Sequence, residues 1–234
     1  INMAIDEVLL SSRVPVLRLY QWKPCAVSIG RYQDLDDIDL DYCTENSIDV
    51  VRRITGGKAV LHEKELTYSF IIDKDEMPRS IIESYKIISS AIIQGLKTLG
   101  LNPEMNSSKI ENRDNPVCFQ EQSFNELTIN RKKFVGSAQV RKKGKLLQHG
   151  SILTGIDTEK HSSCFKEKPE THDLKKRITY IDIPEKNLKS AIKQGFSEYF
   201  NTNLNGRSIC GKELSGAKEL ARTKYRLEAI SVKA

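Results

Sequence analysis

Three runs of residues that favour β-strands follow one another between residues 127 and 153, with almost no chain between them. They cover residues 127–129, 133–140 and 145–153, and short polar turns at Asn130-Arg131 and Lys142-Lys143-Gly144 separate them. Connections this short join strands that run in opposite directions, because a parallel pair needs a long crossover. The sequence therefore predicts an antiparallel meander to which the rest of the chain must adapt.

The other periodic segments predict strands and helices around this meander. Apolar residues three and four apart predict a long helix that opens at Pro78 and runs through Leu99, with Gly100 as its C-terminal cap. We also expect strands at residues 16–20, 26–30, 48–53, 59–62 and 66–72, helices at residues 3–10, 188–200 and 212–225, and a loop at residues 102–116. The fold class is then α+β, with a mixed, mostly antiparallel β-sheet flanked by helices.

Composition narrows the class of protein. The chain has 234 residues, of which 38% are hydrophobic, enough for a full core. No apolar run reaches the roughly 18 residues of a membrane span, and the first residues lack the basic region of a signal peptide, so we expect a cytoplasmic protein without membrane contact. The net charge is +6, but aromatic residues make up 7% and do not interleave with the basic runs, which argues against nucleic acid. A solvated basic face is the plain interpretation, and an acidic protein partner is the functional one.

The five cysteines are Cys25, Cys43, Cys118, Cys164 and Cys210. They are scattered singly, without a CxxC pair or metal-ligand spacing, so we expect neither structural disulfides nor a metal site. Cys118 lies among polar residues that would make a poor core, which favours a thiol placed to react. Cys164 is the rival nucleophile, whereas Cys25 and Cys43 are typical of small core residues.

A glycine-containing loop, Arg52-Arg53-Ile54-Thr55-Gly56-Gly57, lies between two predicted strands. Its glycines let the backbone approach a ligand closely, and the two arginines and backbone N–H groups could hold a phosphate or an acyl carbonyl. Taken alone, such a loop is more often a structural turn than a binding site.

Lys133 and His149 are the other candidates for chemistry. Lys133 precedes Gly136-Ser137-Ala138-Gln139 and could stabilise an oxyanion, although the local sequence taken alone favours the alternative, a solvated lysine in a basic run. His149, before Gly150, could act as a general base, orient a ligand or be a satisfied polar residue.

Four blocks in this order resemble the lipoate-protein ligase and octanoyltransferase superfamily, whose catalytic domain is related to that of biotin-protein ligases. The blocks are NMAIDEVLL, RRITGGKAVLHEKELTYSF, NPVCF and KKFVGSAQVRKKGKLLQHGSIL. The sequence begins inside the first block, without the N-terminal strand usual in the family. The resemblance implies a catalytic core in residues 1–155, with residues 156–234 as a helical extension packed on the same domain.

Within the superfamily the Cys118-Phe119 pair resembles the octanoyltransferases that use a cysteine. The resemblance implies that octanoate passes from octanoyl acyl carrier protein to Cys118 as a thioester, and then to a lysine of a lipoyl domain such as the glycine cleavage H protein. Lys133 would be the second catalytic residue, and no cofactor or metal is implied. The implied substrate-binding residues are Arg52, Arg53, Thr55, Gly56, Gly57, His62, Asn125, Gly136, Ser137, Ala138, Gln139, His149 and Gly150.

Two alternatives stay open. Asn125 followed by an acidic residue resembles the ligases, which would activate free lipoate as an adenylate with ATP and Mg²⁺ and leave Cys118 a bystander. The segment after Cys118 also lacks the proline usual in the transferases. A module that binds lipoyl domains without catalysis is the other alternative, although a pure scaffold has no need for the cysteine, the lysine and both histidines.

Overall fold

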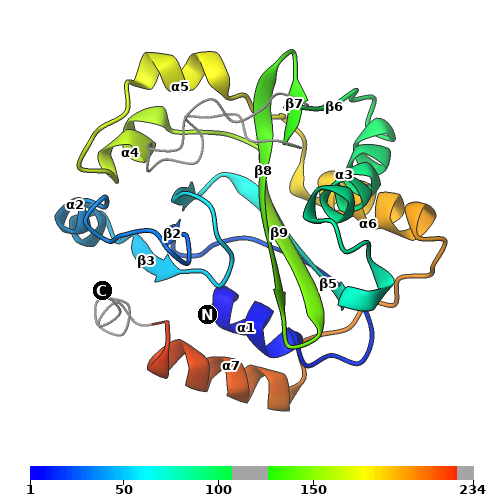
Figure 1. Cartoon of the computed structure of the whole chain (residues 1–234). Helices are drawn as coiled ribbons and strands as arrows, with labels where there is room; N and C mark the ends of the chain where they lie inside the picture. The colour runs from blue at the N-terminus through cyan, green and yellow to red at the C-terminus, as the bar shows by residue number, and fades with distance from the viewer. Residues whose placement is uncertain (107–125, 226–234) are drawn as a thin grey trace.

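A computed structural model describes residues 1–106 and 126–225 (Figure 1). It contains a six-stranded sheet in the order β1-β5-β9-β8-β7-β6 and a three-stranded sheet in the order β3-β2-β4. The strands are β1 (Val16–Tyr20), β2 (Ala26–Ile29), β3 (Asp49–Arg52), β4 (Val60–His62), β5 (Glu65–Asp73), β6 (Glu104–Met105), β7 (Leu127–Ile129), β8 (Lys132–Lys142) and β9 (Lys145–Leu153). The β2–β3 pair is parallel and every other pair is antiparallel, which confirms the α+β prediction.

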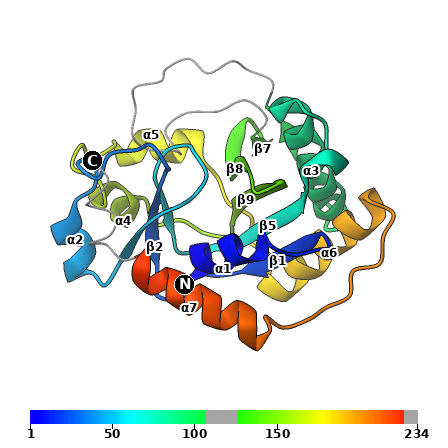
Figure 2. The same ribbon diagram turned by 60° about the horizontal axis from the view of Figure 1, so that its bottom comes forward.

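Helices flank both sheets. They are α1 (Asn2–Leu9), α2 (Leu40–Glu45), α3 (Ile81–Lys97), α4 (Thr158–Ser163), α5 (Thr171–Arg177), α6 (Glu185–Tyr199) and α7 (Gly211–Thr223), with a 3₁₀ turn, η1, at Lys74–Glu76. Figure 2 shows α7 beside α1, while α6 packs on α3. None of the helices in the described ranges is long and apolar enough to cross a membrane.

The predicted meander of β7, β8 and β9 is confirmed. Both of its turns are two-residue loops, and all four loop residues have positive φ: Asn130 (50°), Arg131 (61°), Lys143 (51°) and Gly144 (77°). Positive φ at both central residues defines the type I′ turn, whose twist matches that of the strands it joins.

Alternation along β5 and β9 separates the core from a polar face of the large sheet. Leu66, Tyr68, Phe70 and Ile72 of β5 belong to the core under α3 and α6. Glu65, Thr67 and Ser69 alternate with them along the strand and are buried on the opposite face. On β9 the register places His149 opposite Ser69, and Ser151 opposite Thr67, so the polar residues share that second face.

Several predicted boundaries were wrong. We predicted one sheet, but the strands around the Gly56-Gly57 loop form a second, separate sheet. The long helix begins at Ile81 and not at Pro78, because the Ser80 hydroxyl accepts the backbone N–H of Glu83 and caps it. The predicted loop at residues 102–116 contains the two residues of β6, and its part from residue 107 onward lies outside the described residues.

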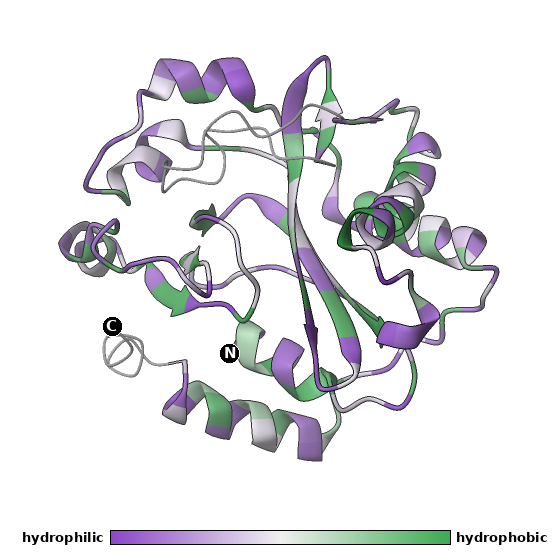
Figure 3. Cartoon of the chain, viewed as in Figure 1, coloured by the Kyte–Doolittle hydropathy of each residue, from purple (hydrophilic) through white to green (hydrophobic). Residues whose placement is uncertain are grey.

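Three short helices were not predicted from the sequence. α2, α4 and α5 have six or seven residues each, too few for a clear apolar period. α5 is mostly hydrophilic (Figure 3), and Leu174 is its buried residue. The predicted helices near residues 188–200 and 212–225 are confirmed as α6 and α7. The division of the chain at residue 155 stays a prediction.

The crossing of α3 and α6 depends on two glycines. A Cβ added to Gly195 would lie 2.3 Å from the carbonyl oxygen of Ala91 and 2.3 Å from the backbone nitrogen of Gly95, and a Cβ on Gly95 would lie 2.3 Å from the carbonyl oxygen of Ala191. The two backbones therefore touch directly at this crossing.

We predict that Gly195→Ala lowers the free energy of unfolding by about 1–3 kcal/mol, because the helices must separate to admit the methyl group. Chemical denaturation measures the change. Gly216→Ala in α7 is the matched control, since its new Cβ would lie 3.6 Å from the nearest atom, in Val8. The control is expected to be neutral or to stabilise by up to about 1 kcal/mol, because alanine favours the helix. Equal stability of the two variants would contradict this account of the crossing.

Candidate active site

The loop after β3 is fixed against the end of β2. The backbone N–H of Arg53 donates to the carbonyl of Ile29, and that of Arg31 donates to the carbonyl of Thr55. Gly57 has a φ of +91°, and a Cβ on Gly30 would lie 1.8 Å from the Gly57 carbonyl oxygen. The two glycines let these backbones touch, so the loop has a fixed position.

Arg53 holds the loop from within. It is 5% exposed, and its guanidinium donates to the backbone carbonyls of Ser28 (2.9 Å), Gly56 (2.9 Å) and Lys58 (2.8 Å). It also donates to the side-chain oxygens of Thr55 (3.1 Å) and Ser28 (3.2 Å). The guanidinium is planar and always charged, and these contacts direct its N–H donors to oxygen atoms of the protein itself.

From Thr55 a hydrogen-bonded chain runs to α1. Nδ1 of His149 faces the Asp6 carboxylate at 3.4 Å, and because a carboxylate only accepts, the ring carries its proton on Nδ1. Nε2 of His149 then accepts from the Thr55 hydroxyl, 2.7 Å away, and Thr55 Oγ1 in turn accepts from Arg53. Arg18 and Tyr20 also donate to Asp6.

A second chain starts at Ser28. Its hydroxyl lies 2.7 Å from Nε2 of His62, and Nδ1 of His62 lies 2.8 Å from Glu65. Oε1 of Glu65 accepts from the hydroxyls of Thr67 and Ser151 as well, so Nδ1 of His62 is the donor here and Nε2 accepts from Ser28. Trp22 stacks on the His62 ring with centroids 4.3 Å apart. Arg53 thus stands between two chains of the same kind, each a hydroxyl, a histidine and a carboxylate.

Burial sets the charge states of the first chain. Burial lowers the pKa of His149 and outweighs the opposing effect of Asp6, so the ring is neutral near pH 7. For Asp6, burial raises the pKa, but the hydrogen bond from His149 and the charge of Arg18 outweigh it and leave the pKa below its ordinary value. The hydrogen-bonded chain from Thr55 to Asp6 therefore pairs a carboxylate with a neutral imidazole.

Lys133 is buried and not solvated, contrary to the alternative that we left open for it. It is 1% exposed and forms an ion pair with Glu126, which is 4% exposed. A lysine buried to this degree needs a partner for its charge.

The segment Gly136–Gln139 divides between the two faces of the sheet, although we predicted all four residues at one site. Ala138 lies opposite His149, and Gly136 lies opposite Ser151. Ser137 and Gln139 lie on the face that packs against α3: Ser137 bonds to Tyr68 at 2.7 Å, and Gln139 accepts from Ser84 at 3.0 Å. Cross-strand pairing thus separates these two from the His149 chain.

Two other predicted residues have their own surroundings. Gly150 lies against Tyr68, and a Cβ there would lie 2.8 Å from the tyrosine ring. Arg52 donates to the carbonyls of Gly30, Arg31 and Gln33, and so holds the turn after β2. Cys118 and Asn125 lie outside the described residues.

The remaining cysteines do not form a second reactive centre. Cys164 is fully buried, its thiol donates to the carbonyl of Lys160, and the neighbouring Cys43 thiol and burial both raise its pKa well above the ordinary value. The predicted packing role of Cys43 is confirmed by its 1% exposure, while Cys25 is half-buried. No group of histidine, cysteine or carboxylate side chains in residues 1–106 and 126–225 is arranged to hold a metal ion.

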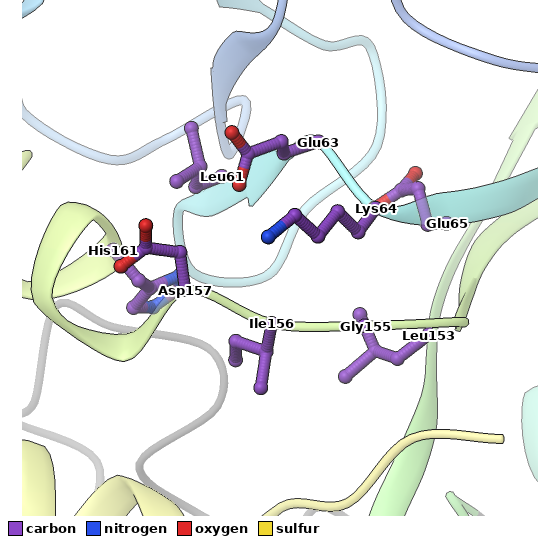
Figure 4. A pocket seen from close by; sticks show the side chains of 9 residues that line it. All are labelled: Leu61, Glu63, Lys64, Glu65, Leu153, Gly155, Ile156, Asp157 and His161. Carbon is purple, nitrogen blue, oxygen red and sulfur yellow. The ribbon is translucent and has the colours of Figure 1, made fainter. Parts of the chain in front are cut away.

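A small cavity lies beside the second chain, between the end of β4 and the start of α4 (Figure 4). Glu65 and His161 line it, together with Lys64 and Asp157. Its volume of about 10 Å³ has room for one water molecule and not for an acyl chain. One oxygen of Glu65, Oε2, is buried without a hydrogen-bond partner, which suits such a water.

Sequence reasoning missed Asp6, Ser28 and Glu65 of this network, and it also missed Glu126, the partner of Lys133. Asp6 left a signal, since it is an acid inside the apolar pattern of α1. Glu65 left a similar one, since it opens a strand that is otherwise largely apolar. An acid in such a place needs a buried partner.

The family model for the catalytic domain of lipoyl protein ligase A/B matches residues 1–198. The chain belongs to this family. Octanoyltransferase LipM of Clostridioides difficile (strain 630) is 40% identical over 259 residues, covering 99% of this chain and 94% of that protein. Octanoyltransferase LipM of Bacillus subtilis (strain 168) is 35% identical over 251 residues, covering 96% and 90%. The resemblance inferred from the four sequence blocks is confirmed.

Solved structures of the family share the fold. A lipoate-protein ligase A bound with ATP superposes with a TM-score of 0.79 at 28% identity, covering 93% of this chain and 87% of that one. A bipartite lipoate protein ligase from Thermoplasma acidophilum, studied with its E2 lipoyl domain, superposes with a TM-score of 0.77 at 26% identity, covering 94% and 86%. The two hydrogen-bonded chains around Arg53 thus lie in a fold that this protein shares with solved lipoate-protein ligases.

We predict that Thr55→Val lowers the free energy of unfolding by about 1–3 kcal/mol, because it leaves buried groups of Arg53 and His149 without the hydroxyl between them. Thr55→Ser keeps the hydroxyl and is expected to stay close to the wild type. Urea denaturation compares the two. If the valine variant were as stable as the serine variant, the Thr55 hydroxyl would not be holding the loop.

A second prediction concerns acid stability. Burial, with a smaller electrostatic contribution from the nearby His62, lowers the pKa of His161 to about 4, whereas an unfolded histidine titrates near pH ~6.5. A lowered folded pKa stabilises the protein above the unfolded value, and up to about 3 kcal/mol of that is lost as the pH falls from ~6.5 towards ~4. His161→Phe should flatten this decline in stability, measured by urea denaturation at several pH values. His172→Asn, at an exposed histidine, is the control, and equal declines in the wild type and the phenylalanine variant would refute the assignment.

Proposed function

We propose that this protein is an octanoyltransferase of lipoate biosynthesis. It would move octanoate from octanoyl acyl carrier protein, through a thioester on Cys118, to a lysine of a lipoyl domain such as the glycine cleavage H protein. The observation that carries the proposal is the similarity, over nearly the whole chain, to octanoyltransferases of the same family. The Cys118-Phe119 pair and the buried Lys133 are consistent with it.

The proposed reaction has two acyl transfers. The Cys118 thiolate attacks the carbonyl carbon of the octanoyl thioester, and the carrier thiolate leaves and takes up a proton. The neutral amine of the acceptor lysine then attacks the new thioester, the Cys118 thiolate leaves, and the amine loses one proton. Both bonds broken are thioesters, so neither step consumes ATP and the proposal includes no cofactor.

Lys133 is the proposed stabiliser of the negative charge that develops on the carbonyl oxygen in both steps. A buried ammonium acts strongly on such a charge, because little water screens it there. Its place on a strand of the large sheet gives it a fixed position.

Other predicted residues take supporting roles in this proposal. Arg53 holds the glycine loop through the carbonyls of Gly56 and Lys58, and Arg52 holds the turn after β2 through the carbonyls of Gly30 and Gln33. We therefore assign both arginines to the shape of the site and not to a phosphate. Thr55, His62 and His149 fix the loop against the large sheet, and Gly136 and Ala138 share the face of His149.

The partners are part of the proposal. A lipoyl domain as acceptor is supported by the family's structure studied with an E2 lipoyl domain. Acidic carrier and acceptor domains would suit the net charge of +6, since opposite charges speed encounter. The cytoplasmic location that the sequence led us to expect is also part of the proposal.

The second candidate is a ligase that activates free lipoate with ATP and Mg²⁺. The related lipoate-protein ligase A bound with ATP favours it. Such an enzyme would use Lys133 and the glycine loop but would not need a nucleophilic Cys118.

Intact mass spectrometry separates the two candidates. The protein is mixed with octanoyl acyl carrier protein without ATP, and an octanoyl adduct that hydroxylamine removes would support the transferase. No adduct, together with ATP-dependent modification of a lipoyl domain by free lipoate, would overturn the proposal in favour of the ligase.

We predict that Cys118→Ser abolishes the adduct and the transfer, because an alcohol is a far weaker nucleophile than a thiolate. Lys133→Ala should lower the transfer rate by roughly 100-fold or more, the usual effect of removing one oxyanion donor. Cys210→Ser, at an exposed cysteine on α7's N-terminal side, is the matched control and should transfer normally. Turnover of Cys118→Ser at the wild-type rate would refute the thioester mechanism.

A further inference from the structure

The ion pair between Lys133 and Glu126 lies within the large sheet. Both side chains are nearly inaccessible, at 1% and 4% exposure. The carboxylate Oε1 of Glu126 accepts directly from the Lys133 ammonium. Taking two charges out of water is costly, and removing one partner of such a pair leaves an uncompensated buried charge.

The backbone on each side of the pair is fixed. The carbonyl of Lys133 accepts the backbone N–H of Thr179 at 2.8 Å, and Lys133 lies opposite Thr128 of β7. The carbonyl of Glu126 accepts the backbone N–H of Asn106 at 2.8 Å. These bonds fix the backbone of both residues, and the ion pair with Glu126 gives the ammonium its position.

A β-bulge turns Lys133 out of the apolar core. Leu127 pairs with Val135 but Thr128 pairs with Lys133, so Phe134 is an extra residue on β8. Phe134 and Val135 both join the core under α3. In a regular strand Lys133 would share the face of Val135, and the extra residue reverses this, which places Lys133 on the same side as Thr128 and Glu126.

Glu126 supplies the negative charge that a buried lysine at this position requires. Burial alone favours the neutral amine of a lysine, while a carboxylate in contact favours the ammonium and draws it to one place. The proposed reaction needs a positive charge at a fixed point beside the acyl carbonyl.

We propose that Glu126 is the positioning residue for Lys133: it keeps the lysine charged and aimed, and it acts on acyl transfer only through that lysine. This rests on the proposed function, in which Lys133 stabilises the oxyanion. Glu126 itself takes no part in bond making.

A double-mutant cycle with purified protein tests this inference. We would measure kcat and KM for acyl transfer in the wild type, Glu126→Gln, Lys133→Ala and the double variant. Glu126→Gln should lower kcat by about 100-fold with KM changed by less than about twofold. The double variant should be no slower than Lys133→Ala, because the glutamate has nothing left to position.

Two further variants separate positioning from folding. Glu126→Asp restores the charge and should recover most of the lost kcat, which a loss of fold would not show. Asp73→Asn removes the acidic partner of Lys145 (2.9 Å) at the far end of the same sheet and should transfer at the wild-type rate. Thermal midpoints of all variants report whether each one folds.

Two results would overturn the inference. One is a loss of kcat in the double variant equal to the product of the fold-losses of the two single variants, which would mean that Glu126 acts independently of Lys133. The other is wild-type turnover by a folded Glu126→Gln. If the wild type transfers only with ATP and free acid, the transferase proposal fails, and the same cycle on that reaction still decides the role of Glu126.

Discussion

Arg53 is the buried charge around which the candidate site is organised. Its guanidinium donates to backbone carbonyls on both sides of the glycine loop and to the hydroxyls of Thr55 and Ser28. Each hydroxyl then meets a histidine, and each histidine meets a carboxylate, so one cation connects the small sheet with the large sheet and with α1. A buried network of this kind stabilises only when every member is satisfied, which makes its arrangement specific.

The large sheet separates two kinds of environment through its pleat. One face carries the aliphatic and aromatic side chains under α3 and α6, and the other carries Glu65, Thr67, His149 and Ser151. A functional group on a strand is held more precisely than one on a loop, and this polar face is built on strands. The same alternation explains why Ala138 belongs with His149, while Ser137 and Gln139 belong to the core side.

Local patterns were sufficient for much of the fold. The meander followed from two short turns, and α3, α6 and α7 followed from apolar spacing, because both signals lie within a few neighbouring residues. The second sheet did not follow, since the pairing of β2 with β3 and β4 depends on tertiary contacts. The burial of Lys133 depends on a bulge at Phe134 that no local pattern marks, and its partner Glu126 was missed for the same reason. Residues of the glycine loop were identified, but the direction of the arginines, towards backbone carbonyls, required the structure.

The chain from Arg53 through Thr55 to His149 has a consequence for the order of events during synthesis. Arg53, Ser28 and His62 lie close in sequence, so their contacts can form as soon as the small sheet has left the ribosome. The partner of Thr55 lies 94 residues later, on β9, and it emerges only after the meander has been made. Domains generally fold as units while the chain grows. A nascent chain released before β9 would therefore lack the histidine that Thr55 contacts and could not complete the buried network around Arg53. Such a truncated product would be a substrate for proteolysis and not a slow enzyme.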